Sequence, residues 1–250
     1  MKHRGRIAWL LALSWVTALA QAELGVSAPA AQPKIAIIID DLGHNLLRDR
    51  QALSLPTSVA VAIIPDTPHA QVLAAHAAQI GHEVLVHMPM ESERQQHPES
   101  TLLSTDMDQD VFEATLARAL AELPQAVGLN NHQGSRLTAE AEPMRWLMRA
   151  LHDNGKLYFV DSRTTNHSVA LRMAADHQVP AVGRHVFLDN ERDPQAIVSA
   201  LQKLAKQAET NGYALGIGHP HPETIETLVW ALPQLAAQGI RLVPPSQLLK

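Results

Sequence analysis

Short runs of apolar residues alternate with longer segments of helical periodicity from Lys34 to the end of the chain. The apolar runs predict strands at 35–39, 59–64, 84–87, 126–129, 157–160, 179–182 with 185–188, 213–217 and 240–243. The segments between most of them predict helices at 67–79, 109–122, 139–153, 168–177, 194–210 and 222–237. Strand followed by helix, repeated about seven times, is typical of parallel strands with helices packed outside them.

The predicted strands contain almost no alternating polar positions, as in IAIII at 35–39 and VAVAII at 59–64. This pattern is typical of strands that are buried on both faces of a sheet. A barrel of seven or eight units and an open doubly wound sheet both fit it. We favour a barrel, because polar residues follow most of the strands and parallel barrels carry their sites at that end. The predicted fold class is therefore α/β.

The N-terminal segment has the pattern of a secretory signal peptide. A start rich in Lys and Arg is followed by an apolar run at 7–20 and by the small-x-small sequence Ala20-Gln21-Ala22. An uncleaved membrane anchor is the alternative, but the run is shorter than the ~20 apolar residues that a span needs. We expect a Sec signal peptide at 1–22, a linker at 23–33 and a single domain at 34–250. The mature protein is then bacterial, periplasmic or secreted, with no membrane span after cleavage.

Composition narrows the range of functions. The chain has no cysteine, so an exported domain of this sequence is held by its core without disulfides. The net charge is -5 and no basic block is present, which argues against nucleic acid as a partner. There are 14 histidines, and imidazole is the commonest metal ligand in proteins, so some of them are candidate ligands.

Polar residues follow the predicted strands at the end where a parallel barrel gathers them. Along the chain they lie at Asp40-Asp41, 65–69 (PDTPH), 86–91 (VHMPME), 129–135 (LNNHQGS), 159–165 (FVDSRTT), 187–190 (FLDN) and 216–224 (GIGHPHPET). Carboxylates, imidazoles and carboxamides thus recur at one predicted rim.

Two adjacent carboxylates at the end of a buried strand repel each other and are costly to desolvate, and a divalent cation relieves both problems. Asp41 can bind the cation while Asp40 acts as a base, since neighbouring strand residues point to opposite faces. His87 and His132 can complete a three-ligand site. One carboxylate and two imidazoles suit catalytic zinc, and also an Fe(II) facial triad. Such a metal would acidify a water that attacks an acyl carbon.

Each of these residues also has a structural interpretation. Asp40-Asp41 can cap a helix, His87 can be a hydrogen-bonded core residue, and Asn130-Asn131 can be turn residues. The sequence Gly218 to Pro222 can be a rigid turn with Pro222 opening a helix. Asp161 can cap a loop with Arg163 or Arg184 as its ion-pair partner. The shared position at strand ends favours the metal site.

Six segments resemble the divergent polysaccharide deacetylases, an exported bacterial group: IAIIIDDLGHN, HEVLVHMPME, VGLNNHQGSRLT, LYFVDSRTT, VFLDN and GIGHPHPETI. The resemblance covers nearly all of the mature chain in order. It implies an irregular seven-stranded (β/α) barrel of the polysaccharide deacetylase type, related to carbohydrate esterase family four. Those enzymes remove N-acetyl or O-acetyl groups from chitin, peptidoglycan or xylan with a divalent metal.

The resemblance also implies roles for residues of this chain. The first Asp of the regular family's pair is the catalytic base and the second binds metal, which gives Asp40 and Asp41 these roles. The regular His-x-x-x-His pair is matched only by His87, because the position four residues later is Glu91. We infer that His132 replaces the missing ligand, with Glu91 as the alternative.

A late histidine of the regular family protonates the leaving group. His219 is the best match to it and His221 the second. The remaining residues that we expect in the substrate pocket are Asn131, Ser135, Asp161 and Glu91, together with His221 if His219 is the acid.

The leading hypothesis is an exported metal-dependent hydrolase, a carbohydrate deacetylase that uses zinc and acts on an acetylated polysaccharide or oligosaccharide. The alternative is a catalytically silent barrel that binds a glycan or a protein partner in the envelope. A third hypothesis pairs Asp40 with Asp161 as the acid and nucleophile of a glycosidase.

Overall fold

Nine parallel strands form the central sheet of the structure, a computed structural model that describes residues 32–94 and 101–249. In chain order the strands are β1 (Lys34–Leu42), β2 (Val59–Ile63), β3 (Val84–Met90), β4 (Gly128–Gln133), β5 (Tyr158–Asp161), β6 (Ala181–Gly183), β7 (Val186–Phe187), β8 (Tyr213–Gly218) and β9 (Arg241–Leu242). Their order in the sheet is β6-β5-β4-β3-β2-β1-β8-β7, and β9 pairs with the start of β1. The predicted signal peptide lies outside the described residues, as does nearly all of the predicted linker.

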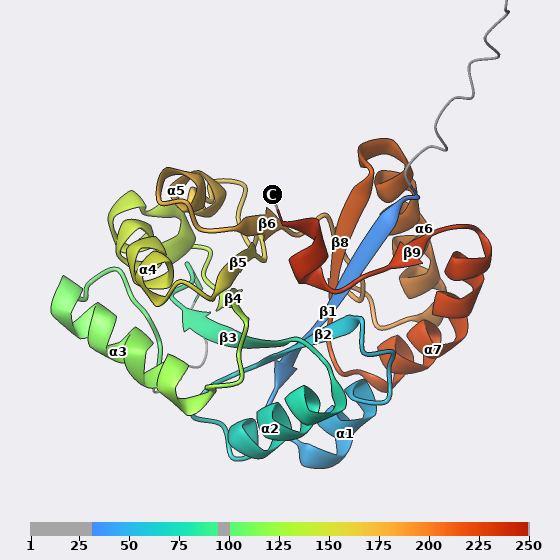
Figure 1. Cartoon of the computed structure of the whole chain (residues 1–250), viewed down its shortest axis with the longest axis horizontal. Helices are drawn as coiled ribbons and strands as arrows, with labels where there is room; N and C mark the ends of the chain where they lie inside the picture. Colours follow the sequence, from blue (N-terminus) through green and yellow to red (C-terminus); the bar gives the residue numbers. More distant parts are fainter. Residues whose placement is uncertain (1–31, 95–100, 250) are drawn as a thin grey trace, which may run out of the picture. The chain divides into compact units, whose positions relative to one another are not determined.

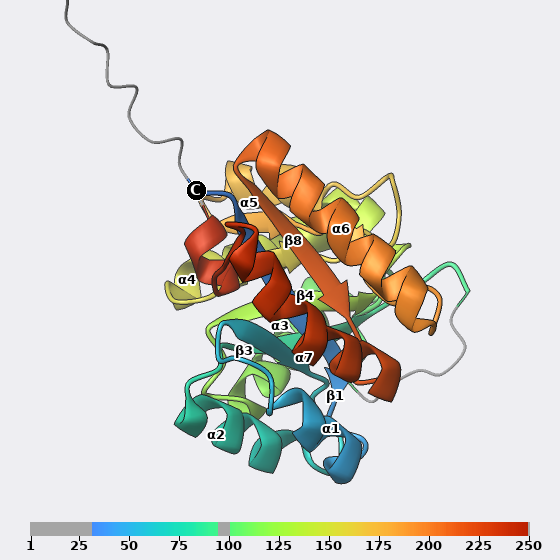
Figure 2. The same ribbon diagram turned by 90° about the vertical axis from the view of Figure 1, so that its right-hand side faces the viewer.

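Helices surround the curled sheet (Figure 1). They are α1 (Leu46–Ala52), α2 (Ala70–Ile80), α3 (Gln109–Glu122), α4 (Ala141–Asn154), α5 (Ala170–Asp176), α6 (Pro194–Asn211) and α7 (Pro222–Ala237), with two short 3-10 helices, η1 (Leu137–Ala139) and η2 (Pro245–Leu248). Figure 2 shows α6 beside β8, and α7 packs against α6. In the part of the chain that the structure describes, no helix is both long and apolar enough to cross a membrane.

The predicted α/β fold class is confirmed, and the strand count is higher than the seven predicted. The additional strands, β7 and β9, have 2 residues each and lie within the apolar runs at 185–188 and 240–243. Within residues 32–94 and 101–249 the chain of pairings ends at β6 and β7, so the curled sheet is open between these two strands. Helix α1 was not expected from the sequence.

Alternate residues of each strand face two different cores. In β1, Ile37 and Ile39 belong to the large core under the outer helices, whereas Ala36 and Ile38 belong to a smaller inner cluster. Residues two apart in a strand share a face, so Asp40 follows Ala36 and Ile38 on the inner side. The inner face is therefore apolar near the strand starts and polar at the carboxyl ends.

Candidate metal centre

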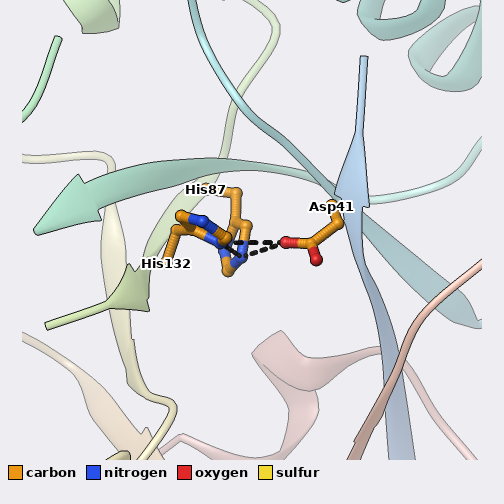
Figure 3. A group of neighbouring side chains, drawn as sticks. All are labelled: Asp41, His87 and His132. Carbon is orange, nitrogen blue, oxygen red and sulfur yellow. Dashed lines mark hydrogen bonds and ion pairs between the residues drawn. The ribbon is translucent and has the colours of Figure 1, made fainter. Parts of the chain in front are cut away.

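Asp41, His87 and His132 come from three strands and meet at one point. Each of them offers one ligand atom, and these atoms lie within 4.8 Å of one another. Asp41 Oδ1 is 2.9 Å from His132 Nδ1 and 3.1 Å from His87 Nε2, and the two ring nitrogens are 3.1 Å apart. Figure 3 shows the three side chains directed toward one another from β1, β3 and β4. The residues predicted as ligands are thus side by side.

A bulge near the end of β1 brings both carboxylates to this site. The pairing of β1 with β2 shifts register between Ile39 and Leu42, and Asp41 has a left-handed φ of 61°. An extra residue in a strand re-aims the side chains that follow it, which is common beside functional sites. Asp40 Oδ2 and Asp41 Oδ1 consequently lie 3.7 and 3.1 Å from the same atom, Nε2 of His87. The expectation that the two point to opposite faces is wrong.

The cluster fits a divalent cation. Asp41 Oδ1 is buried, and its contacts with the described residues are the ring nitrogens of His132 at 2.9 Å and His87 at 3.1 Å, neither of which forms a regular hydrogen bond with it. An unsatisfied buried oxygen is costly unless a positive charge compensates it. Donor atoms of one tetrahedral zinc ion lie roughly 3.3 Å apart, close to the spacing observed here. One carboxylate and two imidazoles also match the ligand set of catalytic zinc sites.

Asn130 connects two members of the site and was not among the residues selected from the sequence. Its amide donates to Asp40 Oδ1 at 2.9 Å, and its Oδ1 lies 2.8 Å from His87 Nδ1. It is fully buried in β4, so it is not a turn residue. The spacing offered a signal, since Asn130 is two residues before His132 and therefore shares its strand face.

The charges of the site shift the pKa values of its members. Burial raises the pKa of Asp40, and His87 and His219 offset this only in part. Burial also acts to raise the pKa of Asp41, but His132 and His87 hold it well below its usual range. Burial acts to lower the pKa of His87, yet Asp40 and Asp41 raise it to about 9. The carboxylate pair thus stabilises a positive charge at this position.

His219 lies next to Asp41 and is held by Asp189, a carboxylate that the sequence analysis did not select. Its Nδ1 is 2.9 Å from Asp189 Oδ1, and its Nε2 is 3.7 Å from Asp41 Oδ2. Asp189 Oδ2 also accepts hydrogen bonds from the backbone N–H of His219 at 2.6 Å and from Thr224 Oγ1 at 2.8 Å. Burial acts against both ions, but the pairing lowers the pKa of Asp189 and raises that of His219.

Asp189, His219 and His221 form a second group of close potential ligands. We interpret it as an oriented histidine rather than a second metal site, because both oxygens of Asp189 already accept hydrogen bonds. The His221 ring centre lies 5.8 Å from that of His219. Pro222 opens α7, so the turn interpretation of this segment is also correct, and it coexists with the role in the site.

Glu91 and Asp161, which we expected in the substrate pocket, form hydrogen bonds and ion pairs with residues outside the candidate metal centre. Glu91 Oε1 pairs with Arg136 at 2.9 Å, and its Oε2 accepts from the backbone and hydroxyl of Thr105 at 2.7 and 2.6 Å, so Glu91 does not join the ligand cluster. Asp161 accepts from the backbone N–H of Arg163 and from Ser168 Oγ, both at 2.8 Å, which agrees with the interpretation of Asp161 as a loop cap.

Asn131 and Ser135 likewise act in the loops that follow the strands. Asn131 accepts from the backbone N–H of Ser162 at 2.8 Å and donates to the carbonyl of Gln133 at 2.7 Å. Ser135 Oγ accepts from the backbone N–H of Glu93 at 3.0 Å. Neither residue lines the pocket beside the cluster.

A pocket of about 300 Å³ opens beside the cluster. Asp41, His132, His219 and His221 contribute to its lining, and Ile64 and Pro220 give it apolar walls. A larger hollow of about 640 Å³ touches Glu83 and Tyr158 at the opposite ends of the strands and contains none of these site residues. The chemistry-bearing residues therefore share the smaller pocket.

The fold and the site together define a curled α/β barrel with a candidate carboxylate–histidine metal centre at the carboxyl ends of its strands. The chain belongs to the divergent polysaccharide deacetylase family, whose family model matches residues 37–249. The resemblance seen in the sequence is confirmed.

The chain is also similar to a curated protein and to two solved structures. It is 38% identical over 229 residues to the uncharacterized protein YibQ of Escherichia coli (strain K12), covering 90% of this chain and 70% of that protein. The crystal structure of uncharacterized protein ATU2773 from Agrobacterium tumefaciens C58 superposes with a TM-score of 0.84 at 25% identity, over 89% and 91% of the two chains. A BA3943 mutant, described as a CE4 family pseudoenzyme with restored enzymatic activity, shares the fold at 12% identity, with a TM-score of 0.54 over 88% and 68%.

Proposed function

We propose that the protein is an exported, metal-dependent hydrolase that deacetylates a cell-envelope or exogenous polysaccharide. The observation that carries this proposal is the meeting of Asp41, His87 and His132 beside a pocket, with Asp40 3.7 Å from His87 and His219 3.7 Å from Asp41. Membership in the family supports the reaction class, and the basic and apolar N-terminal segment supports export.

Asp41, His87 and His132 would hold the cation, for which we propose zinc, with Fe(II) as the alternative that the same ligand set allows. When bound, the metal supplies Lewis acidity, which polarises an acyl carbonyl and makes water easier to deprotonate. Asn130 contributes by holding the Nδ1 proton of His87, so that Nε2 faces Asp41.

Asp40 is the group that takes the proton of the attacking water. Its Oδ1 accepts the amide of Asn130, and its Oδ2 is directed toward His87. The buried position fixes the side chain and raises its pKa, and the adjacent imidazoles offset this effect in part. A fixed carboxylate close to the cluster meets the geometric requirement of a general base.

His219 is the group that donates a proton to the departing amine or alcohol. Asp189 binds its Nδ1, so the Nε2 side is turned toward Asp41 and the pocket. A carboxylate behind the imidazole fixes the ring and stabilises its protonated form, as a general acid requires. Ile64 and Pro220 offer an apolar surface for the methyl of an acetyl group.

Acetate release from acetylated chitooligosaccharides and peptidoglycan fragments tests this function. The purified wild-type protein, loaded with zinc, is expected to release acetate, and Asp40→Asn is expected to abolish it. The matched control is Asp110→Asn on α3, which replaces an exposed carboxylate of an outer helix. Elemental analysis is expected to give about one metal per chain, lost in Asp41→Ala and His87→Ala.

The silent barrel is the second candidate, and one observation favours keeping it. BA3943 is described as a CE4 family pseudoenzyme of related fold, and one of its mutants as having restored enzymatic activity, so a barrel of this type can exist without activity. Bound metal without acetate release from any of the substrates would support a binding protein and reject the hydrolase.

A further inference from the structure

The pocket beside Asp41 carries two arginines from different parts of the chain. Arg48 comes from α1 and Arg192 from the loop before α6, and both line the pocket together with His44. The whole chain has a net charge of -5. Two guanidinium groups in the lining of one small pocket therefore form a local positive charge on a protein whose net charge is negative.

Neither arginine is fully used by the protein itself. Arg192 is exposed, and its guanidinium makes no hydrogen bond or ion pair with the residues that the structure describes. Arg48 has its Nε 3.2 Å from Asp49 Oδ1. Asp49 in turn accepts the backbone N–H groups of Gly43 and Asn45 at 2.8 and 3.1 Å, so this carboxylate belongs to the turn after β1. The terminal nitrogens of both arginines are available to a ligand.

The positive field of these side chains extends into the pocket. Burial lowers the pKa of His221, and Arg192 and Arg48 lower it further, while Asp189 acts in the opposite direction. Both guanidinium groups are thus close enough to act on a residue of the pocket wall.

The pocket also lacks the usual means of binding a neutral sugar. Among the described residues that line it there is no Trp, Tyr or Phe, the side chains on which sugars usually stack. Arginine forms paired, charge-assisted hydrogen bonds with carboxylates and phosphates. A volume of about 300 Å³ is at the small end of ligand pockets and suits a single substituted sugar ring.

We propose that Arg48 and Arg192 form an anion subsite, so that the substrate is an acetylated sugar that carries a carboxylate or a phosphate near its acetyl group. That the substrate carries an acetyl group rests on the proposed function. That it carries a negative charge rests on the two arginines alone. The anionic group binds at the mouth of the pocket and directs the acetyl group toward Asp41 and His132.

Isothermal titration calorimetry with three monosaccharides tests the subsite. The probes are N-acetylglucosamine, N-acetylmuramic acid and N-acetylglucosamine 6-phosphate, which share the acetyl group and differ in charge. The zinc-loaded Asp40→Asn protein is used, so that binding is measured without turnover. We expect both anionic sugars to bind about tenfold or more tighter than the neutral one, and this preference to weaken as salt is added. The sugar that gains more identifies the source of the anion.

The arginines are then replaced in the same background. Arg48→Gln with Arg192→Gln is expected to reduce the affinity for the anionic sugars to that for the neutral one. Arg145→Gln, an exposed arginine on α4, is the matched control and is expected to change nothing. Thermal melting verifies that each variant is folded.

Three results would overturn the anion subsite. They are equal affinity for neutral and anionic sugars, no binding of either anionic sugar at millimolar concentration, and a preference for anionic sugars that remains after both arginines are replaced. Acetate release by the wild-type protein is a separate measurement. Charge-selective binding without acetate release would support the anion subsite and reject the hydrolase. Acetate release from neutral sugars alone would support the hydrolase and reject the anion subsite.

Discussion

The Nδ1 atom of His87 donates a hydrogen bond to Oδ1 of Asn130 across 2.8 Å. An amide oxygen only accepts, so a neutral His87 carries its proton on Nδ1 and its lone pair on Nε2, the atom that faces Asp41. The same amide donates to Asp40 through its nitrogen. One buried carboxamide thus sets the ring of a candidate ligand and the carboxylate of the candidate base.

Asn130→Ala is expected to weaken metal binding by about 10- to 100-fold, the usual effect of removing the partner of a ligating histidine. Competition with a chromogenic chelator measures the zinc affinity. The control is Asn211→Ala at the exposed end of α6. An unchanged affinity in folded Asn130→Ala would mean that the hydrogen bond does not orient His87.

The two late histidines are expected to respond differently to replacement. His219→Ala removes the ring that Asp189 holds toward Asp41, so acetate release is expected to fall by about 100-fold or more. His221→Ala is expected to cost less than about tenfold, because Asp189 forms its hydrogen bonds with His219 and Thr224, and no described carboxylate holds the ring of His221 in this way. Metal content is expected to stay the same in both variants. A larger loss of acetate release in His221→Ala than in His219→Ala would instead assign the role of proton donor to His221.

The sequence placed the candidate ligands at one rim, since Asp41, His87 and His132 lie at the ends of apolar strands, but it left Glu91 open as an alternative to His132. Asp41, His87 and His132 lie where parallel strands converge, so their meeting follows from the strand pattern. Helices α3 and α7 likewise begin and end at the predicted residues. The apolar periodicity of a helix depends only on neighbouring residues in the sequence, so the bounds of these two helices could be predicted without knowing how the chain folds.

The residues that were missed depend on pairings between distant segments. Asp189 follows β7, which has 2 residues, and its bond to His219 depends on how that strand pairs with β8. The bulge at Asp41 arises in the pairing of β1 with β2, and it breaks the alternation assumed for the two carboxylates. Helix α1 has 7 residues, of which only Asp49 and Ala52 are buried, so it shows no apolar stripe, and Asn45 rather than Asp40-Asp41 caps it.

Gly43→Ala is expected to lower the free energy of unfolding by about 2–4 kcal/mol. Gly43 has a φ of 126°, which side-chain-bearing residues rarely adopt, and an added Cβ would overlap Oγ1 of Thr67. The control is Gly212→Ala, where φ is 83° and nothing lies within 4 Å of the added atom, so only about 1 kcal/mol is expected. Urea denaturation measures both. Equal losses would show that the turn after Asp41 adapts to the added methyl group.

The last prediction concerns alkaline pH. Tyr158 is buried at the start of β5 and donates to Glu83 Oε2 at 2.8 Å, and burial together with Glu83 raises the pKa of this tyrosine well above 10. In the unfolded chain the pKa is about 10, so folding favours the protonated phenol. The resulting stabilisation is complete below about pH 10 and is lost as the pH rises toward the folded pKa.

Urea denaturation at about pH 8 and at about pH 11 is expected to show a large loss of stability in the wild-type protein and a smaller one in Tyr158→Phe, which has no phenol to ionise there. At about pH 8 the variant itself is expected to lose about 1 kcal/mol with the hydrogen bond. Tyr213→Phe, which replaces the other of the 2 tyrosines, keeps Tyr158 and is expected to keep the alkaline loss. An equal alkaline loss in wild type and Tyr158→Phe would assign the effect to other groups.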